Sequence, residues 1–166
     1  GYSIAKGRLN ETHYHEVLSS RLDSVNALIQ LIKWADHVPS VWVQASAIGY
    51  YGDRSNEVLT ESSDLGAGPL AEICFQWESE LTAAILKYQL PIRTVIARLG
   101  VVLASDAVAW QRMVLPVKLG VSGALGSGRQ WWSWIHIDDV VASLVDFVQQ
   151  LKYMGVYNLT APEPLQ

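Results

Sequence analysis

The sequence predicts an α/β fold built on a doubly wound parallel sheet. Short segments rich in Val, Ile and Ala alternate along the chain with longer segments whose apolar residues recur at helical spacing. The short segments are apolar almost without interruption, which is typical of strands covered by helices on both faces. The resulting order, helix, strand, helix, strand, helix, helix, strand, is the rhythm of such a sheet. The elements expected from this pattern span residues 12–36, 41–48, 69–88, 92–103, 108–119, 139–151 and 155–159.

The first helix and the strand after it follow from two different apolar patterns. Between Thr12 and Asp36, apolar residues recur every three or four positions and polar residues occupy the other side. These apolar positions are Leu18, Leu22, Val25, Leu28, Ile29 and Ile32. After Pro39, residues 41–48 are almost wholly apolar and end at Gly49. We therefore expect a long amphipathic helix followed by a buried strand.

A polar segment separates this strand from the second helix. Residues 50–68 are rich in Gly, Ser, Asp and Asn, so they predict a long loop, and loops of that length are commonly functional. Pro69 suits the first turn of a helix, because its missing N–H would have no partner there. The apolar stripe of the helix over 69–88 consists of Leu70, Ile73, Trp77, Leu81, Ala84, Ile85 and Tyr88.

The third helix is expected to be short. It follows residues 92–103, which are interpreted as one buried strand. Pro116 would limit the helix over 108–119 to about two turns before the chain bends. The glycine-rich residues 120–128 then predict a loop or a hairpin.

The last part of the chain predicts a strand, a helix and a strand. His136 lies in a short strand, and Asp138 is placed to accept the backbone N–H bonds that open the helix over 139–151. Residues 155–159 form the final strand. Three buried strands would leave unpaired backbone along at least one side of the sheet, so further strands are expected. We expect the natural chain to extend toward the N-terminus and also toward the C-terminus.

The composition excludes several classes of protein. A net charge of −4, with the charges scattered, shows neither a basic nucleic-acid footprint nor a membrane-surface patch. A single cysteine, Cys74, allows no internal disulfide and fits a reducing cytoplasm. No apolar run approaches the roughly 18 residues that a membrane span needs. The four histidines match no metal-site spacing, so no metal site is predicted. We expect a cytoplasmic protein that binds neither nucleic acid nor membrane.

A tryptophan-rich segment is the most distinctive part of the sequence. Residues 126–139 contain Trp131, Trp132 and Trp134 together with Arg129. Aromatic side chains beside one fixed positive charge suit a cleft that stacks a flat ligand and pairs it with an anion. The alternative is that the tryptophans fill the core where a hairpin meets a helix.

Five segments occur in an order that resembles one family. They are Ala45 to Asp53, Leu59 to Glu61, Arg98 to Leu103, Gly126 to Asp139 and Gly155 to Pro162. The chain resembles the extended short-chain dehydrogenases/reductases, and within them the atypical epimerase-like branch of sugar-nucleotide epimerase or NAD-dependent epimerase/dehydratase homologues. The resemblance runs essentially from Gly1 to Pro164.

The resemblance implies the C-terminal portion of a Rossmann-like sheet. The family's N-terminal strands, with the glycine-rich phosphate loop that follows the first of them, have no counterpart in this sequence. Residues 1–166 would then be a partial NAD(P)-binding domain, with the substrate-binding region beginning at about 107–134. The implied cofactor is NADP(H) or NAD(H), with NADP(H) slightly preferred. The implied cofactor contacts are Gly1, Ala45, Ser46, Ala47, Leu99, Gly100, Val101 and Val102.

The usual catalytic pair of the family is missing here. The resemblance places Leu70 at the position of the family's tyrosine and Cys74 at that of its lysine. Neither side chain can exchange a proton with a substrate in the way that a tyrosine beside a lysine does. The candidates for catalysis are therefore Ser46, at or next to the family's serine position, and the phenols of Tyr50 and Tyr51. For Ser46, a local hydrogen bond to the backbone is the alternative.

The substrate side of the site departs from the family as well. Trp132 and Ser133 stand where nucleotide-sugar enzymes of this group commonly carry Arg and Asp. Arg129 is the candidate replacement for the anion clamp, with a surface ion pair as the alternative. The predicted substrate-binding residues are Arg129, Trp132 and Trp134, and they suggest a flatter and more apolar ligand than a sugar nucleotide.

Two functions remain open at this point. The first is an NAD(P)-dependent oxidoreductase or epimerase-like protein that acts on a small carbonyl, hydroxyl or nucleotide-sugar-like substrate. The second is a catalytically weak dinucleotide-binding or scaffold protein of the same fold. A homodimer through the helices over 12–36 and 69–88 is expected by analogy with the family.

Arg98 follows apolar strand residues. If its side chain is buried, it needs a carboxylate partner, and Glu61 or Glu78 could supply one.

Overall fold

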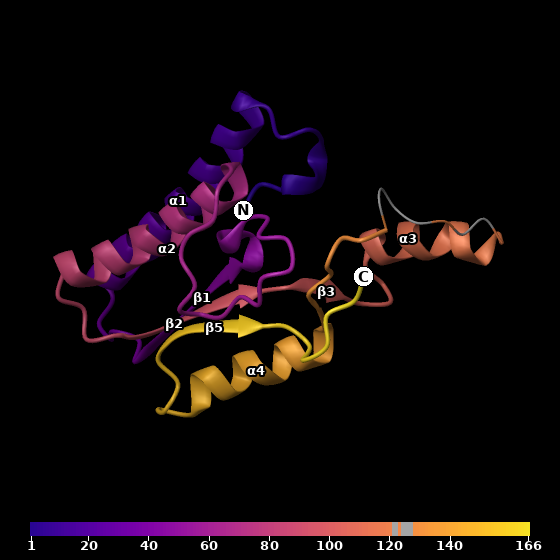
Figure 1. Ribbon diagram of the computed structural model, residues 1–166. Coiled ribbons are helices and arrows are strands. Elements are labelled where there is room, and N and C mark those ends of the chain that lie inside the picture. Colours follow the sequence, from indigo (N-terminus) through magenta and orange to yellow (C-terminus); the bar gives the residue numbers. More distant parts are fainter. Residues whose placement is uncertain (121–122, 124–127) are drawn as a thin grey trace.

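The computed structural model describes residues 1–120, 123 and 128–166 and has an α/β architecture (Figure 1). Two single-turn 3₁₀ helices, η1 and η2, span Ile4–Lys6 and Ile48–Tyr51. The α-helices are α1 (Glu11–Trp34), α2 (Pro69–Lys87), α3 (Val108–Lys118) and α4 (Ile137–Gln149). The strands are β1 (Val41–Ala47), β2 (Arg93–Leu99), β3 (Val101–Leu103), β4 (Trp134–His136) and β5 (Gly155–Leu159).

The main sheet contains three parallel strands in the order β1-β2-β5. Helices α1 and α2 lie on one face of this sheet and α4 lies on the other (Figure 1). The expected doubly wound arrangement is therefore confirmed. Among the described residues, no further strand pairs with the outer edges of β1 and β5.

Two apolar clusters hold the layers together, one on each face of the sheet. The first joins α1 and α2 to the sheet and consists of Val25, Ile29, Trp42, Leu81, Ala84 and Ile92. The second joins α4 to the other face and consists of Val95, Ala97, Ile135, Val140, Phe147 and Leu159. Successive strand residues point to opposite faces, so a strand buried on both faces must be apolar at nearly every position. This explains why the sequence of the strands shows no alternation.

The predicted strand over 92–103 is wrong as a single element, because the chain changes partner at Gly100. The amide of Gly100 donates to the carbonyl of Leu159 in the main sheet, at 3.0 Å. The amide of Val101 donates instead to the carbonyl of Ser133, at 2.8 Å, and β3 pairs with β4 in a separate parallel sheet. A Cβ at position 100 would lie 2.5 Å from the Ser133 carbonyl oxygen. Glycine therefore allows the close approach at which the chain leaves one sheet for the other.

The third helix is longer than the sequence suggested. Helix α3 has 11 residues and contains Pro116, so the limit of about two turns is wrong. Pro116 lies only two residues before the end of the helix at Lys118, where the loss of one backbone hydrogen bond breaks little of the helix. The predicted loop or hairpin over 120–128 falls partly on residues 121–122 and 124–127, which lie outside the described residues.

The cap of the last helix also differs from the prediction. His136 occupies the N-cap of α4, and its Nδ1 accepts a hydrogen bond from the backbone N–H of Asp138 at 3.2 Å. Asp138 is thus inside the first turn and is not the cap. Its charge still favours the helix, because the N-terminal end of a helix is electropositive.

Candidate functional site

The carboxyl ends of the three parallel strands meet at one edge of the sheet. The register pairs Ala47 with Leu99 and Leu99 with Leu159, so β1, β2 and β5 end side by side. In open α/β sheets, ligands bind outside the carboxyl ends of the strands. The predicted cofactor residues Ala45 to Ala47 and Leu99 to Val102 lie at or next to this edge. Gly1 lies against Arg21 of α1, and its contact with a cofactor stays a prediction.

A tight turn follows β1 and positions two tyrosines. The backbone carbonyl of Tyr50 accepts a hydrogen bond from the amide of Gly66 at 3.0 Å, so the loop over 52–68 returns to this turn. A Cβ at position 66 would lie 1.8 Å from the backbone oxygen of Tyr51. Glycine is therefore required for the loop to pack against the turn.

A polar row crosses the main sheet one residue before the strands end. Ser46 pairs with Arg98 across β1 and β2, and Arg98 pairs with Asn158 across β2 and β5. The face that Ser46 and Arg98 share is covered by α2, which contributes Glu78. A polar residue near the end of each of three apolar strands is a sequence signal that could have located this row.

Arg98 and Glu78 form a buried, bidentate ion pair within this row. The Arg98 Nη2 lies 2.8 Å from Glu78 Oε2, and Nε donates to Oε1 at 2.9 Å. The two side chains are only 4% and 9% exposed. Burial alone would lower the pKa of Arg98, but hydrogen bonds to Glu78 and Tyr51 and the charge of Glu78 raise it above its ordinary value. Arg98 therefore stays charged, and Glu78 rather than Glu61 is its carboxylate.

Two of the three predicted catalytic hydroxyls take part in this network. Ser46 Oγ donates to Glu78 Oε1 at 2.5 Å, rather than to local backbone. Tyr51, which is 2% exposed, accepts a hydrogen bond from Arg98 Nη1 at 2.9 Å. It donates its own proton to Asn158 Oδ1 at 2.7 Å. Both hydroxyls are thus engaged inside the protein.

Tyr50 is arranged differently from its neighbour. The Arg98 guanidinium carbon lies 3.4 Å from the centre of the Tyr50 ring, which is a close cation–π contact. The residue is half-buried, and its hydroxyl makes no hydrogen bond to the described residues. Of the three predicted catalytic groups, only the Tyr50 phenol keeps its proton available for a ligand.

The structure also connects the loop over 52–68 to the rest of the site. Glu61 accepts a hydrogen bond from the backbone N–H of Asn158 at 2.8 Å. Asn56 accepts one from the indole of Trp131 at 2.8 Å. Sequence reasoning did not assign Asn56 or Asn158 a role, because their partners are about 75 to 107 positions away along the chain.

Leu70 and Cys74 lie beside the tyrosine-containing turn, on the first turns of α2. A Cβ at Gly49 would lie 3.7 Å from Leu70 Cβ and 3.8 Å from Cys74 Sγ. Leu70 is 41% exposed, whereas Cys74 is buried. Burial raises the pKa of the Cys74 thiol, and the charge of Glu78 adds to this effect. The two positions thus face the site, but neither supplies a base or a cation.

We expect the Cys74 thiol to resist modification in the folded protein. Its raised pKa keeps it protonated, and at pH about 8 it should react with Ellman's reagent at least tenfold more slowly than in urea. The unfolded thiol ionises at a lower pH than the folded one, so Cys74 lowers stability as pH rises from about 8 to 10. Urea unfolding of Cys74→Ala should show a shallower loss over this range. Equal slopes would contradict the assignment.

The three predicted tryptophans separate in the structure. Trp131 is 47% exposed and reaches the loop through Asn56. Trp132 pairs with Leu165 through two backbone hydrogen bonds, at 2.6 and 3.0 Å. Trp134 begins β4, and its indole N–H donates to the carbonyl of Glu163 at 3.2 Å. Arg129 is exposed.

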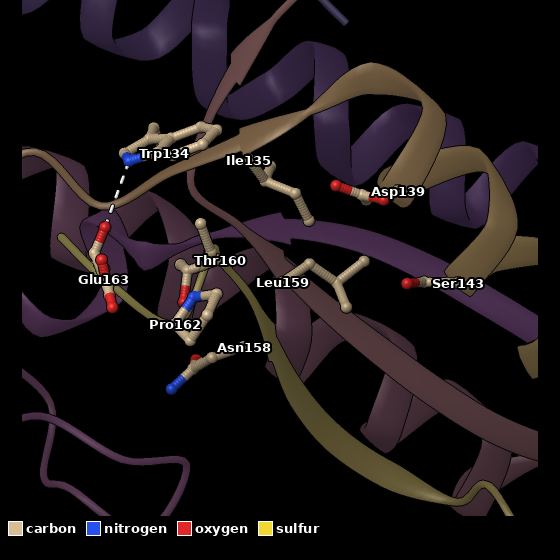
Figure 2. Close-up of a pocket in the computed structure, with 10 residues that line it drawn as sticks. Trp134, Ile135, Asp139, Ser143, Asn158, Leu159, Thr160, Pro162 and Glu163 are labelled. Carbon is tan, nitrogen blue, oxygen red and sulfur yellow. Dashed lines mark hydrogen bonds between the residues drawn. The ribbon is translucent and has the colours of Figure 1, made fainter.

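A cavity of about 470 Å³ lies beyond the carboxyl end of β5, between β4 and α4 (Figure 2). Its lining consists of Trp134, Ile135, Asp139, Ser143, Asn158, Leu159, Thr160, Ala161, Pro162 and Glu163. Of the predicted substrate-binding residues, only Trp134 lines it. The cavity is linked to the buried row through Asn158, whose Oδ1 accepts the hydrogen bond from Tyr51.

The chain is similar to curated epimerase family proteins. An epimerase family protein SDR39U1 homologue, described as chloroplastic, from Arabidopsis thaliana is 38% identical over 153 residues, covering 91% of this chain and 43% of that protein. An epimerase family protein from Staphylococcus epidermidis is 39% identical over 158 residues, covering 95% of this chain and 52% of that protein. The chain thus spans about half the length of these relatives. No protein-family model matches it.

Solved structures give the same result. The human epimerase family protein SDR39U1, crystallised with NADPH, superimposes with a TM-score of 0.86 at 32% identity, covering 98% of this chain and 55% of that one. A nucleoside-diphosphate sugar epimerase from Corynebacterium glutamicum superimposes with a TM-score of 0.80 at 29% identity, covering 96% of this chain and 34% of that one.

Among the described residues, no helix is both long enough and apolar enough to cross a membrane.

Proposed function

Because this chain has the fold of the epimerase-like short-chain dehydrogenases/reductases, we propose that it takes part in NAD(P)-dependent chemistry on a small carbonyl or hydroxyl compound. One observation carries the proposal. Ala47 and Leu99 end adjacent parallel strands, at the edge where open α/β sheets bind their ligands. The likeness to a protein that was crystallised with NADPH supports NADP(H) as the first cofactor to test.

The residues at this edge fit the nicotinamide end of such a cofactor. Two small residues, Ala45 and Ala47, leave the backbone at the end of β1 open to a flat ring. None of the described segments that lead from a strand into a helix is a short G-x-G-x-x-G turn, and the glycines between β1 and α2 belong to a long loop, so these residues do not supply the usual cradle for the pyrophosphate. The cofactor, when bound, supplies or accepts the hydride.

In this proposal, Tyr50 is the catalytic residue that moves the proton. When a carbonyl carbon receives the hydride, its oxygen takes the proton of the Tyr50 hydroxyl, and an alcohol results. The positive charge of Arg98 against the ring favours the negative charge that then develops on the phenol. Ser46 and Tyr51 act as positioning residues, since both hold the Arg98–Glu78 pair in place.

Cofactor binding can be tested without knowing the substrate. Val101 lies directly after Gly100 and is 41% exposed, so Val101→Glu would place a carboxylate beside the polyanionic cofactor. We expect the dissociation constant of NADPH, measured by fluorescence titration of the natural full-length protein, to rise about tenfold. Val145→Glu is the matched control, because Val145 is 45% exposed on α4. If the wild-type protein does not bind NADPH, or if the two variants behave alike, the proposal is wrong.

A second candidate function is a dinucleotide-binding or scaffold protein without efficient turnover. The observation that favours it is the loss of proton-exchanging groups at Leu70 and Cys74, together with the engagement of Ser46 and Tyr51 in the buried row. Such a protein would bind NADPH but show no turnover with any small carbonyl compound. The Tyr50 variant discussed below separates the two functions.

Three expectations stay predictions. They are the cytoplasmic location, the homodimer formed through α1 and α2, and a substrate-binding region that begins within residues 107–134. The oligomeric state can be measured by analytical ultracentrifugation of the natural full-length protein.

A further inference from the structure

The cavity between β4, α4 and the segment after β5 has the size of a small-molecule site. Its volume of about 470 Å³ falls within the range of roughly 300–1,000 Å³ that ligand pockets occupy. Ile135 and Leu159 form an apolar floor, since both are buried. The Trp134 indole, fixed by its hydrogen bond to the Glu163 carbonyl, lies at the edge of the cavity, on the opposite side of β4 from Ile135 (Figure 2).

Polar groups without internal partners converge on this cavity. Asp139 and Ser143 lie four residues apart and therefore share one face of α4. Figure 2 shows both side chains projecting from α4 toward the floor formed by Ile135 and Leu159. Neither side chain, nor the hydroxyl of Thr160, makes a hydrogen bond to any other described residue. Acceptors and donors are thus available to a ligand.

The charge of the lining is one-sided. Asp139 and Glu163 contribute two carboxylates, and the described residues of the lining include no Lys, Arg or His. The N-terminus of α4 would by itself attract an anion, but Asp138 and Asp139 already occupy its first turn. A phosphate or carboxylate group would therefore be repelled, whereas a protonated amine would be attracted to Asp139.

We propose that this cavity binds a small polyhydroxy compound that carries a protonated amine, of which an amino sugar is the simplest example. Hydroxyl groups of the ligand would bond Ser143 and Thr160, its amine would pair with Asp139, and its apolar face would lie against Ile135 and Leu159. Taking this compound as the substrate rests on the proposed function; its binding to the cavity does not.

Binding of simple sugars to the natural full-length protein tests the proposal. Glucosamine, glucose, glucuronate and UDP-glucose are titrated by ligand-observed NMR at pH about 6.5, where the amine is protonated. We expect glucosamine to bind at least about fivefold more tightly than glucose, and both anionic compounds to bind more weakly than glucose. Asp139→Asn should abolish the preference for glucosamine. Asp146→Asn, on the same helix but outside the lining, should retain it.

Several outcomes would overturn the proposal. They are the absence of glucosamine binding, binding of glucuronate or UDP-glucose as tight as that of glucosamine, and an unchanged preference in Asp139→Asn. NADPH is titrated into the same samples. A protein that binds NADPH but not glucosamine contradicts only the cavity assignment, whereas one that binds glucosamine but not NADPH contradicts only the proposed function.

Discussion

We expect Glu78→Gln to lower the free energy of unfolding by about 3–5 kcal/mol, because it leaves the buried charge of Arg98 without a counter-charge. Both oxygens of Glu78 are used: Oε1 accepts from Ser46 and Arg98, and Oε2 accepts from Arg98 again. A glutamine would present an NH₂ group to one of these donors. The measurement is urea unfolding of the natural full-length protein.

A matched control and a double variant make this prediction sharper. Glu72 is exposed on the same helix, so Glu72→Gln should change stability by less than about 0.5 kcal/mol. The double variant Glu78→Leu/Arg98→Met removes both charges together, and we expect it to be more stable than Glu78→Gln alone. A loss below about 1 kcal/mol in Glu78→Gln would contradict the importance of the pair.

Much of the fold could be predicted from the sequence, because it depends on local patterns. The spans of α1, α2 and the apolar strands were each confirmed within a few residues, but Leu28 and Leu70 of the predicted apolar stripes are 48% and 41% exposed. The change of partner at Gly100 was missed, since a run of apolar residues on both sides of it conceals the point where β2 ends. The His136 cap was missed because Asp is a commoner N-cap residue than His, so the sequence favoured Asp138. The structure begins the helix at Ile137, which makes His136 the N-cap residue.

The site was less predictable, because its contacts join residues that are far apart in the sequence. Arg98 could have paired with Glu61 or Glu78, and the choice depends on how α2 packs against the sheet. Tyr50 and Tyr51 are adjacent, yet one is half-buried with a free hydroxyl among the described residues and the other is fully engaged. Such differences arise from tertiary packing, which no local pattern records.

This difference between the tyrosines changes what the missing catalytic pair implies. The resemblance places Leu70 and Cys74 at the positions of the usual tyrosine and lysine, so a phenol and a cation must come from elsewhere if turnover is retained. The structure brings Arg98 against both tyrosines, and of these only Tyr50, with the guanidinium carbon 3.4 Å from its ring centre, has a hydroxyl without a partner among the described residues. Glu78 holds this guanidinium in place through two hydrogen bonds. The buried ion pair thus connects stability to the proposed chemistry.

We expect Tyr50→Phe to reduce turnover about 100-fold, the scale on which a general acid acts, while leaving NADPH affinity unchanged. The phenylalanine ring keeps the contact with Arg98, and the hydroxyl has no partner among the described residues, so stability should change by less than about 0.5 kcal/mol. The assay follows the near-ultraviolet absorbance of NADPH with small aldehydes and ketones, and its formation from NADP⁺ with amino sugars.

Tyr51→Phe is the matched variant and should behave in the opposite way. It leaves Arg98 Nη1 and Asn158 Oδ1 without their partner, so we expect a loss of about 1–3 kcal/mol in stability and a much smaller loss in turnover. If Tyr51→Phe loses turnover and Tyr50→Phe does not, the proton passes through the other phenol. If the wild-type protein binds NADPH but turns over none of these compounds, the catalytic function is wrong and the dinucleotide-binding function is supported. The Tyr50 phenol and the Arg98 cation would then have no part in a reaction.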